Sequence, residues 1–374
     1  MAYKIAQMHS VILKGDAVSN IMRTIHDINI SQGYQDNLVA DLFSEYKEIP
    51  TLASYDFNKD PLIARLAYLF SRFVRLENKA KWIREYLKAM GQYHQGVAKS
   101  IIENADIRIW HYGAFYNLFR QFHAKDILYY ANITYPYLSN FSEFGMFSKN
   151  MLYAILDLEP FAIVQSAFTK RNLIALGFPE SSIRILPLFH KYNLPYAQHS
   201  HAEAKLIAWG RYAKNKAIPE LVEASNSYKL HLRMFGDNSQ VKEFKEQYSE
   251  AVNKNGKGYA ELSGKIPDFE AELGKANIYI CNSYHEGFNM PLIEAEAHSL
   301  PVLARRGTAM DELVKDGYNG YLFGSISEVP ALADKIMHNY AAMSRNAWQH
   351  SRGYTLEKYK ERYLRILKEY QEYR

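Results

Sequence analysis

The stretch that decides the fold runs from position 285 to 323 and reads HEGFNMPLIEAEAHSLPVLARRGTAMDELVKDGYNGYLF. An apolar segment, 277–281, precedes it and predicts a buried strand. A loop containing Gly287 follows, and Pro291 predicts a helix start, because a proline has no N–H to leave unsatisfied in the first turn. Residues 301–304 predict the next parallel strand. This is a strand–loop–helix–strand unit, and open α/β sheets bind ligands at the carboxyl ends of their strands.

Two carboxylates mark this unit. Glu286 lies in the loop, and Glu294 follows about one helical turn after Pro291. We expect both to face the crevice toward which the helix N-terminus points its free N–H groups. Those N–H groups and the helix dipole attract phosphate, which carboxylates repel. The carboxylates must therefore serve other groups, and sugar hydroxyls fit because they donate strong hydrogen bonds to ionised carboxylates.

The same stretch resembles the signature of retaining family-four glycosyltransferases with the GT-B fold. The resemblance implies an α/β fold with two Rossmann-like, doubly wound parallel-sheet domains that face a cleft, and a C-terminal helix that crosses back to the first domain. The alternative is an ordinary Rossmann-type turn whose glutamates lie on a helix surface. The matching residues are Glu286-Gly287-Phe288, Pro291-Leu292, Glu294-Ala295, Pro301-Val302, Glu312 and Gly320-Tyr321-Leu322.

The bulk composition is that of a globular protein with two domains. The chain has 374 residues, of which 48% are hydrophobic and 23% charged, and its net charge is +5. The single cysteine, Cys281, falls in a predicted buried strand, which favours an inert core thiol and a reducing cytoplasm. No stretch approaches 18 uninterrupted apolar residues, so we expect no transmembrane helix. We also expect no nucleic-acid partner.

Strand and helix patterns alternate along both halves of the chain, which predicts parallel sheets. We predict an N-terminal acceptor-binding domain at 1–195, a C-terminal nucleotide-sugar-binding domain at 196–350 and a final helix at 351–374 that packs back on the first domain. The segment 190–204 has three histidines and no clear periodicity, and we interpret it as a solvated linker rather than a metal site. The predicted strands are 3–8, 38–42, 107–110, 126–130, 161–165, 183–188, 206–209, 230–235, 259–262, 277–281 and 301–304.

The segment 60–90 is basic and helical in pattern. Together with Lys59 it carries eight basic and three acidic residues, and eight minus three gives +5, equal to the net charge of the whole chain. A basic amphipathic helix can lie on an anionic membrane surface, which would place a cytoplasmic enzyme at the inner face of the membrane. The alternative, which we favour slightly, is a helix packed on the sheet with a solvated basic face.

A second motif follows the predicted strand 206–209. The run Gly210-Arg211-Tyr212-Ala213-Lys214-Asn215-Lys216 resembles the diphosphate-binding loop of the same family. When a nucleotide sugar is the donor, negative charge grows on the leaving diphosphate in the transition state. A guanidinium and an ammonium stabilise that charge, so we expect Arg211 and Lys216 to be catalytic. The resemblance adds Glu286 as a third catalytic residue. The alternative is a pair of solvated surface cations.

The resemblance also implies the donor-binding residues. Glu286 contacts the hydroxyls of the donor sugar, and Glu294 contacts those of the ribose. The resemblance further implies retention at the anomeric carbon, no metal ion and no cofactor beyond the donor substrate. Asp16 could equally be a simple helix cap. The other residues implied at the donor site are Gly15, Asp16, Gly210, Gly287, Phe288, Asn289 and Met290.

Two positions depart from the family pattern. Ala131 stands where the family has a histidine that helps hold the donor sugar. His111, at the end of the neighbouring predicted strand, could enter the same cleft, and a buried, satisfied histidine is an equal alternative. Ser299 stands where glycine is common, and we expect it to matter only for packing.

The resemblance therefore implies a retaining, metal-independent hexosyltransferase. We expect it to move a mannose- or glucose-type hexose from a GDP- or UDP-hexose to a glycan or lipid-linked acceptor in surface polysaccharide synthesis. Two alternatives stay open. One is a non-catalytic homologue that acts as a binding or scaffold subunit, for which Ala131 is the support in the sequence. The other is a different enzyme of the same fold, such as a sugar phosphorylase or a nucleotide-sugar epimerase.

Overall fold

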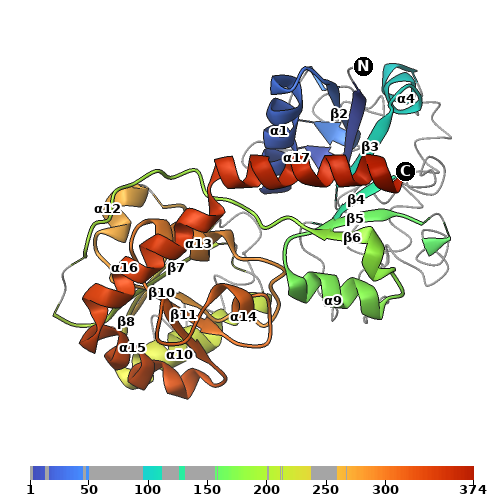
Figure 1. Ribbon diagram of the computed structural model, residues 1–374. Helices are drawn as coiled ribbons and strands as arrows, with labels where there is room; N and C mark the ends of the chain where they lie inside the picture. The colour runs from blue at the N-terminus through green and yellow to red at the C-terminus, as the bar shows by residue number, and fades with distance from the viewer. Residues whose placement is uncertain are drawn as a thin grey trace, which may run out of the picture. The chain divides into compact units, whose positions relative to one another are not determined.

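The described part of the chain forms two compact units, drawn in Figure 1. The first unit comprises Met1–Gln165, Thr169–Ile185 and Arg365–Arg374, and the second comprises Ser166–Phe168 and Leu186–Leu364. The computed structural model describes residues 3–12, 17–44, 48–49, 96–111, 126–130, 156–157, 159–199, 202–210, 212, 214–236, 259–266 and 268–374.

The first unit is built on a six-stranded parallel sheet with the strand order β2-β1-β3-β4-β5-β6. From β1 the chain goes outward to the edge strand β2, and it then returns past β1 to β3 and continues to β6, which is the doubly wound arrangement. The strands are β1 (Lys4–Ile12), β2 (Gln35–Ser44), β3 (Ile107–His111), β4 (Ile127–Tyr130), β5 (Phe161–Val164) and β6 (Ile183–Ile185). The helices are α1 (Ala17–Ser31), α4 (Gly96–Glu103), α9 (Ala167–Ala175) and the short η2 (Glu180–Ser182).

Helix α1 ends before a glycine. Gly33 lies just beyond the helix and has a φ of +78°, in the left-handed region that glycine adopts without steric cost. The following strand β2 then runs beside β1. All four residues of β5 are buried, as expected for a strand of a parallel sheet that is covered on both faces.

The last helix, α17 (Leu356–Tyr373), begins in the second unit, and residues Arg365–Arg374 belong to the first. Within the first unit the ring of Tyr370 lies 5.2 Å from that of Phe161 in β5. Arg184 in β6 forms an ion pair with Glu369. The predicted crossing of the C-terminal helix is therefore confirmed.

The second unit also has a six-stranded parallel sheet, with the order β12-β11-β10-β7-β8-β9. Strand β12 was recognised in the sequence only as part of a motif. The strands are β7 (Lys205–Trp209), β8 (His231–Phe235), β9 (Ala260–Ser263), β10 (Ile278–Cys281), β11 (Val302–Arg305) and β12 (Gly320–Phe323). The helices are η3 (Lys214–Lys216), α10 (Ile218–Tyr228), α12 (Phe269–Leu273), α13 (Met290–Ala297), α14 (Met310–Leu313), η5 (Ile326–Glu328), α15 (Val329–His338), α16 (Tyr340–Ser351) and η6 (Arg352–Tyr354).

The segment 190–204 differs from the solvated linker that we expected. His190 is buried, its Nε2 lies 2.9 Å from the carbonyl oxygen of Ser351, and burial lowers the pKa of its imidazole. His199 Nε2 lies 2.8 Å from the carbonyl oxygen of His298. The expectation was wrong for His190, because this segment packs along the end of α16 inside the second unit. Among the described residues no group of three or more His, Cys, Asp or Glu side chains could hold a metal ion.

Ser299 has a φ of +65°, so our expectation that it matters only for packing was incomplete. The left-handed conformation just after α13 accounts for a preference for glycine at this position. Its hydroxyl accepts a hydrogen bond from the Ala197 N–H at 3.2 Å, and its carbonyl accepts one from Ser344 Oγ at 2.6 Å. These hydrogen bonds stabilise a left-handed backbone conformation that residues with a Cβ rarely adopt.

The basic segment 60–90 lies outside the described residues, so its membrane contact stays a prediction. Within the described ranges, no helix is both long enough and apolar enough to span a membrane.

Candidate functional site

Lys216 and Glu286 contact each other at the carboxyl ends of β7 and β10. Lys216 ends the short helix η3 that follows β7, and Glu286 lies in the loop between β10 and α13. Lys216 Nζ and Glu286 Oε1 form an ion pair. The Glu286 side chain is only 7% exposed and that of Lys216 is 22% exposed. A buried carboxylate is costly without a partner, so the ammonium stabilises the charge that Glu286 carries here.

Backbone hydrogen bonds tie the two loops together. The Tyr284 N–H donates to the carbonyl of Asn215 at 2.8 Å, and Asn215 Nδ2 donates to the carbonyl of His285 at 3.2 Å. The carbonyl of Glu286 accepts a hydrogen bond from the Ala309 N–H at 3.1 Å. The position of the Glu286 backbone is therefore set by neighbours on both sides.

Gly287 and Phe288 pack within the second unit. The carbonyl of Gly287 accepts a hydrogen bond from Ser166 Oγ at 2.7 Å, and Ser166 is grouped with this unit. Phe288 is buried, and its ring centroid lies 5.9 Å from that of Tyr354. These contacts do not test donor binding by Gly287 and Phe288, which stays a prediction.

Asn289 caps helix α13. Its Oδ1 accepts a hydrogen bond from the Leu292 N–H at 2.9 Å, and Tyr279 OH donates to the same oxygen at 3.3 Å. Helix α13 begins at Met290, so Pro291 occupies its first turn as predicted. The side chain of Asn289 thus has a structural role as a helix cap. This role could be predicted from the sequence, since Asn before a helical pattern is a frequent cap.

Glu294 lies against the end of β7. Trp209 Nε1 donates a hydrogen bond to Glu294 Oε2 at 3.3 Å. Burial raises the pKa of Glu294, against the opposing effects of Trp209 and then of the charges of His298 and Lys191. Neither Trp209 nor His298 was recognised from the sequence as a neighbour of Glu294, although the indole N–H of a buried tryptophan usually finds an acceptor.

The two carboxylates both act on a buried tyrosine. Burial raises the pKa of Tyr279 well above its ordinary value, and the charges of Cys281, Glu286 and Glu294 add to that effect. Burial also raises the pKa of the Cys281 thiol, and Cys281 forms no disulfide. The thiol therefore fits the inert core cysteine expected from the sequence.

The backbone conformation of Gly210 explains its residue type. Its φ is +142°, and its N–H donates to the carbonyl of Phe235 at 3.0 Å. A Cβ at the neighbouring Gly236 would lie only 2.5 Å from the Gly210 carbonyl oxygen. The loops after β7 and β8 therefore meet through two glycines, and any donor contact of Gly210 stays a prediction.

His111 is buried at the end of β3 in the first unit. Its Nε2 lies 2.9 Å from Gln7 Oε1, and Gln7 Nε2 donates to Asp36 Oδ2 at 2.6 Å. Burial raises the pKa of Asp36, against hydrogen bonds from Asn29 and Gln7. There are two alternatives for His111, a residue that enters the donor cleft or a buried, satisfied histidine. This geometry favours the second. The other predicted residues, Gly15, Asp16, Ala131 and Arg211, lie outside the described residues.

Residues 203–341 match the family model described as "Glycosyl transferases group 1". An uncharacterized glycosyltransferase of Methanocaldococcus jannaschii is 30% identical over 115 residues, which cover 30% of this chain and 32% of that protein. The GtfA subunit of a Streptococcus gordonii UDP-N-acetylglucosamine–peptide N-acetylglucosaminyltransferase is 25% identical over 212 residues, covering 51% of this chain and 40% of its own length. The matched segments span less than half the length of these curated relatives.

Solved structures share the whole fold. A sucrose-phosphate synthase from Thermosynechococcus elongatus superposes with a TM-score of 0.69 at 16% identity and covers 98% of both chains. The Anabaena protein HepE in complex with UDP and glucose gives a TM-score of 0.66 at 15% identity, over 98% of this chain and 100% of that one. The fold is therefore GT-B, as predicted. The segment 203–341 of the second unit, which matches the glycosyl transferases group 1 model, includes Lys216, Glu286 and Glu294.

Proposed function

We propose that this protein is a retaining glycosyltransferase that uses a nucleotide-diphosphate hexose as donor. The observation that carries the proposal is the contact between Lys216 and Glu286, which come from two loops at the carboxyl ends of β7 and β10. Both lie inside the segment that matches the glycosyl transferases group 1 model. The neighbour HepE, whose structure contains UDP and glucose, supports a nucleotide-sugar donor.

In the proposed reaction the donor replaces the contact between the two side chains. Lys216 moves onto the diphosphate, where negative charge grows as the bond from the anomeric carbon to the phosphate oxygen breaks. Arg211 assists there. Glu286 then accepts hydrogen bonds from hydroxyls of the hexose, and Glu294 accepts them from the ribose.

The acceptor hydroxyl approaches the face that the leaving diphosphate vacates. Its oxygen forms the new bond to the anomeric carbon, and its proton passes to the leaving phosphate oxygen. The configuration is thereby retained without a covalent enzyme intermediate. We propose that the reaction needs no metal ion, because the two cations neutralise the diphosphate.

The hexose is of the mannose or glucose type, the donor is a GDP- or UDP-hexose, and the hexose is transferred to a glycan or lipid-linked acceptor in surface polysaccharide synthesis. We place the reaction in the cytoplasm, with the basic segment 60–90 as a peripheral contact with anionic membrane.

The test is a thermal-shift measurement with UDP, GDP, ADP and their sugars, without added metal, followed by an assay for release of the diphosphate in the presence of acceptors. A ligand at about a hundredfold its dissociation constant adds roughly 2.7 kcal/mol of stability. One responding base with acceptor-dependent release of its diphosphate supports the proposal. No response to any of these compounds would refute it.

A non-catalytic binding or scaffold subunit is the second candidate. The substitution that favours it is Ala131 in place of the family histidine. Nucleotide-sugar binding without release of the diphosphate, whatever acceptor is added, would support this candidate over the enzyme.

A further inference from the structure

We propose that Arg305 is a positioning residue of the candidate site. Together with Asn282 and Glu220 it holds the two loops that bring Lys216 and Glu286 into contact. The inference rests on the proposed function, since it assigns a role in that reaction to a residue that touches neither of the two side chains directly.

The residue after Lys216 has a strained backbone conformation. Ala217 has φ +46° and ψ +47°, a left-handed conformation that a residue with a Cβ rarely adopts. It lies between η3 and α10 as the N-cap of α10, so it sets the direction in which the backbone leaves Lys216. The carbonyl of Ala217 accepts a hydrogen bond from Asn282 Nδ2 at 3.1 Å. A disfavoured conformation of this kind persists when surrounding groups hold it.

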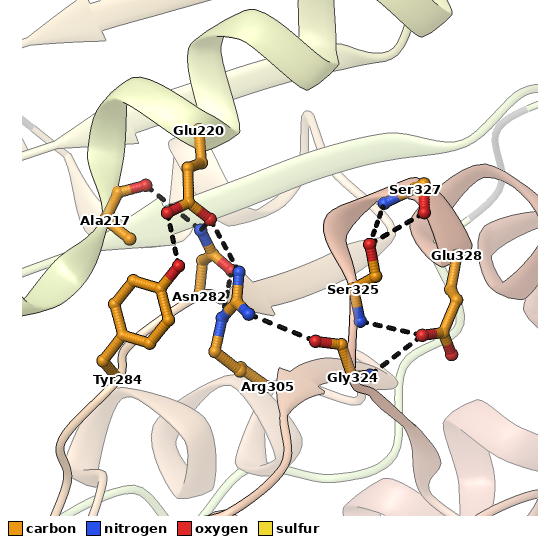
Figure 2. Close-up of polar contacts among 9 residues, drawn as sticks. All are labelled: Ala217, Glu220, Asn282, Tyr284, Arg305, Gly324, Ser325, Ser327 and Glu328. Carbon is orange, nitrogen blue, oxygen red and sulfur yellow. Dashed lines mark hydrogen bonds and ion pairs between the residues drawn. The ribbon is translucent and has the colours of Figure 1, made fainter.

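Arg305 fixes the side chain that holds Ala217. Arg305 ends β11 and is largely buried, and its Nε donates to Asn282 Oδ1 at 2.8 Å. This bond orients the amide so that its Nδ2 faces the Ala217 carbonyl, as Figure 2 shows. The remaining guanidinium nitrogens bond Glu220 Oε2 at 2.7 Å and the Gly324 carbonyl at 3.2 Å.

The same guanidinium also holds the loop of Glu286. It lies 4.4 Å from the ring centroid of Tyr284, and Tyr284 OH donates to Glu220 Oε1 (Figure 2). Tyr284 is two residues before Glu286, and its N–H donates to the carbonyl of Asn215 beside Lys216. One cation thus contacts two residues of the Glu286 loop directly and reaches the Lys216 loop through Asn282, whose amide donates to the Ala217 carbonyl.

The residue type at 305 is decisive for this arrangement. A guanidinium presents donors in a fixed, planar fork and can stack on an aromatic ring. A lysine keeps the charge, but it cannot reach Asn282, Glu220 and Gly324 in those directions at once. A buried ion pair is by itself weak evidence for stability, so the value of Arg305 lies in the geometry it imposes.

The matched variants are Arg305→Lys and Arg306→Lys. Arg306 is the exposed neighbour, and its guanidinium donates to the Leu322 carbonyl at 2.9 Å. Hydrogen exchange of the peptides 214–221 and 282–290 and the steady-state release of diphosphate from UDP-glucose and GDP-mannose are compared with wild type. We expect Arg305→Lys to speed exchange in both peptides. We also expect it to lower kcat by about 10- to 100-fold with a smaller change in KM, as for displaced supporting groups.

The route through Lys216 is tested by a double-mutant cycle. In a Lys216→Ala background, Arg305→Lys should lower kcat/KM by less than about twofold, because residues that act through one another are not additive. An equal loss in both backgrounds, or wild-type exchange and kcat in Arg305→Lys, would overturn the proposal. Where the rate of the Lys216 variant is too low to measure, the exchange of the two peptides decides alone. If wild-type protein releases no diphosphate from either donor, the proposed function fails, while the exchange data still test whether Arg305 holds the loops.

Discussion

At the scale of single residues, substitutions in the ion pair of Lys216 and Glu286 can separate effects on the stability of the protein from effects on its activity. Lys216→Met would leave the buried Glu286 carboxylate without its partner and lower the stability by about 3 kcal/mol. It would also lower kcat by about 10²- to 10³-fold, because a group that stabilises transition-state charge is gone. Urea unfolding and diphosphate release measure the two effects.

The double variant Lys216→Met/Glu286→Gln is the matching control. It should recover most of the stability, since no uncompensated buried charge remains, and none of the activity. Recovery of both would show that the pair serves the fold alone.

A second residue-scale prediction concerns Glu296, which is fully buried in α13. Burial raises its pKa above the ordinary 4.5, against opposing effects of His350 and Asn319. The folded state therefore holds a proton that the unfolded state releases between pH 4.5 and the raised pKa. Stability contributed by this group is present below pH 4.5 and is lost as the pH rises through the folded pKa.

The measurement is urea unfolding of wild type and Glu296→Gln at a series of pH values upward from 4.5. The stability of wild type relative to the variant should fall as the pH rises. Glu223→Gln, at an exposed position of α10, controls for the loss of one negative charge. A relative stability that rises with pH would contradict the prediction.

At the scale of elements, helix α10 ends in a conformation that its sequence does not favour. Lys229 follows the helix with a φ of +57°, in the left-handed region. Lys229→Gly should stabilise the protein by about 0.5–1 kcal/mol, because glycine has no Cβ to strain there. Thermal unfolding measures the gain. Lys229→Ala removes the same charge and keeps the Cβ, so an equal gain from it would exclude this explanation.

Most strands were predictable because parallel strands buried on both faces read as short apolar runs, as in β5 and β10. Strand β12 was missed, since its Gly320 start and half-exposed Tyr321 and Leu322 interrupt that pattern. The motifs identified both loops of the candidate site. They did not predict that Lys216 would contact Glu286, because that contact joins residues 70 positions apart and depends on how two loops pack.

At the scale of the whole molecule, the end of the chain completes a unit that begins at its start. Tyr370→Ala would empty a buried site against Phe161 and destabilise the protein by about 3–5 kcal/mol. Hydrogen exchange should speed up in β5 and β6 more than in β10 and β11, because residues 365–374 belong to the first unit. Glu372→Ala, at an exposed position of the same helix, is the control. Uniform loosening of both sheets would show that the two units unfold together.

The division of α17 between the two units also orders events during synthesis. The strands of the first unit precede residues 186–364 in the chain, but residues 365–374, the part of α17 that covers Phe161, are translated only after them. Until then Phe161 stays uncovered on the sheet of the nascent chain. Exposed apolar surface of this kind is bound by chaperones and aggregates in their absence. The first unit is therefore completed only after residues 186–364 and then residues 365–374 have been translated.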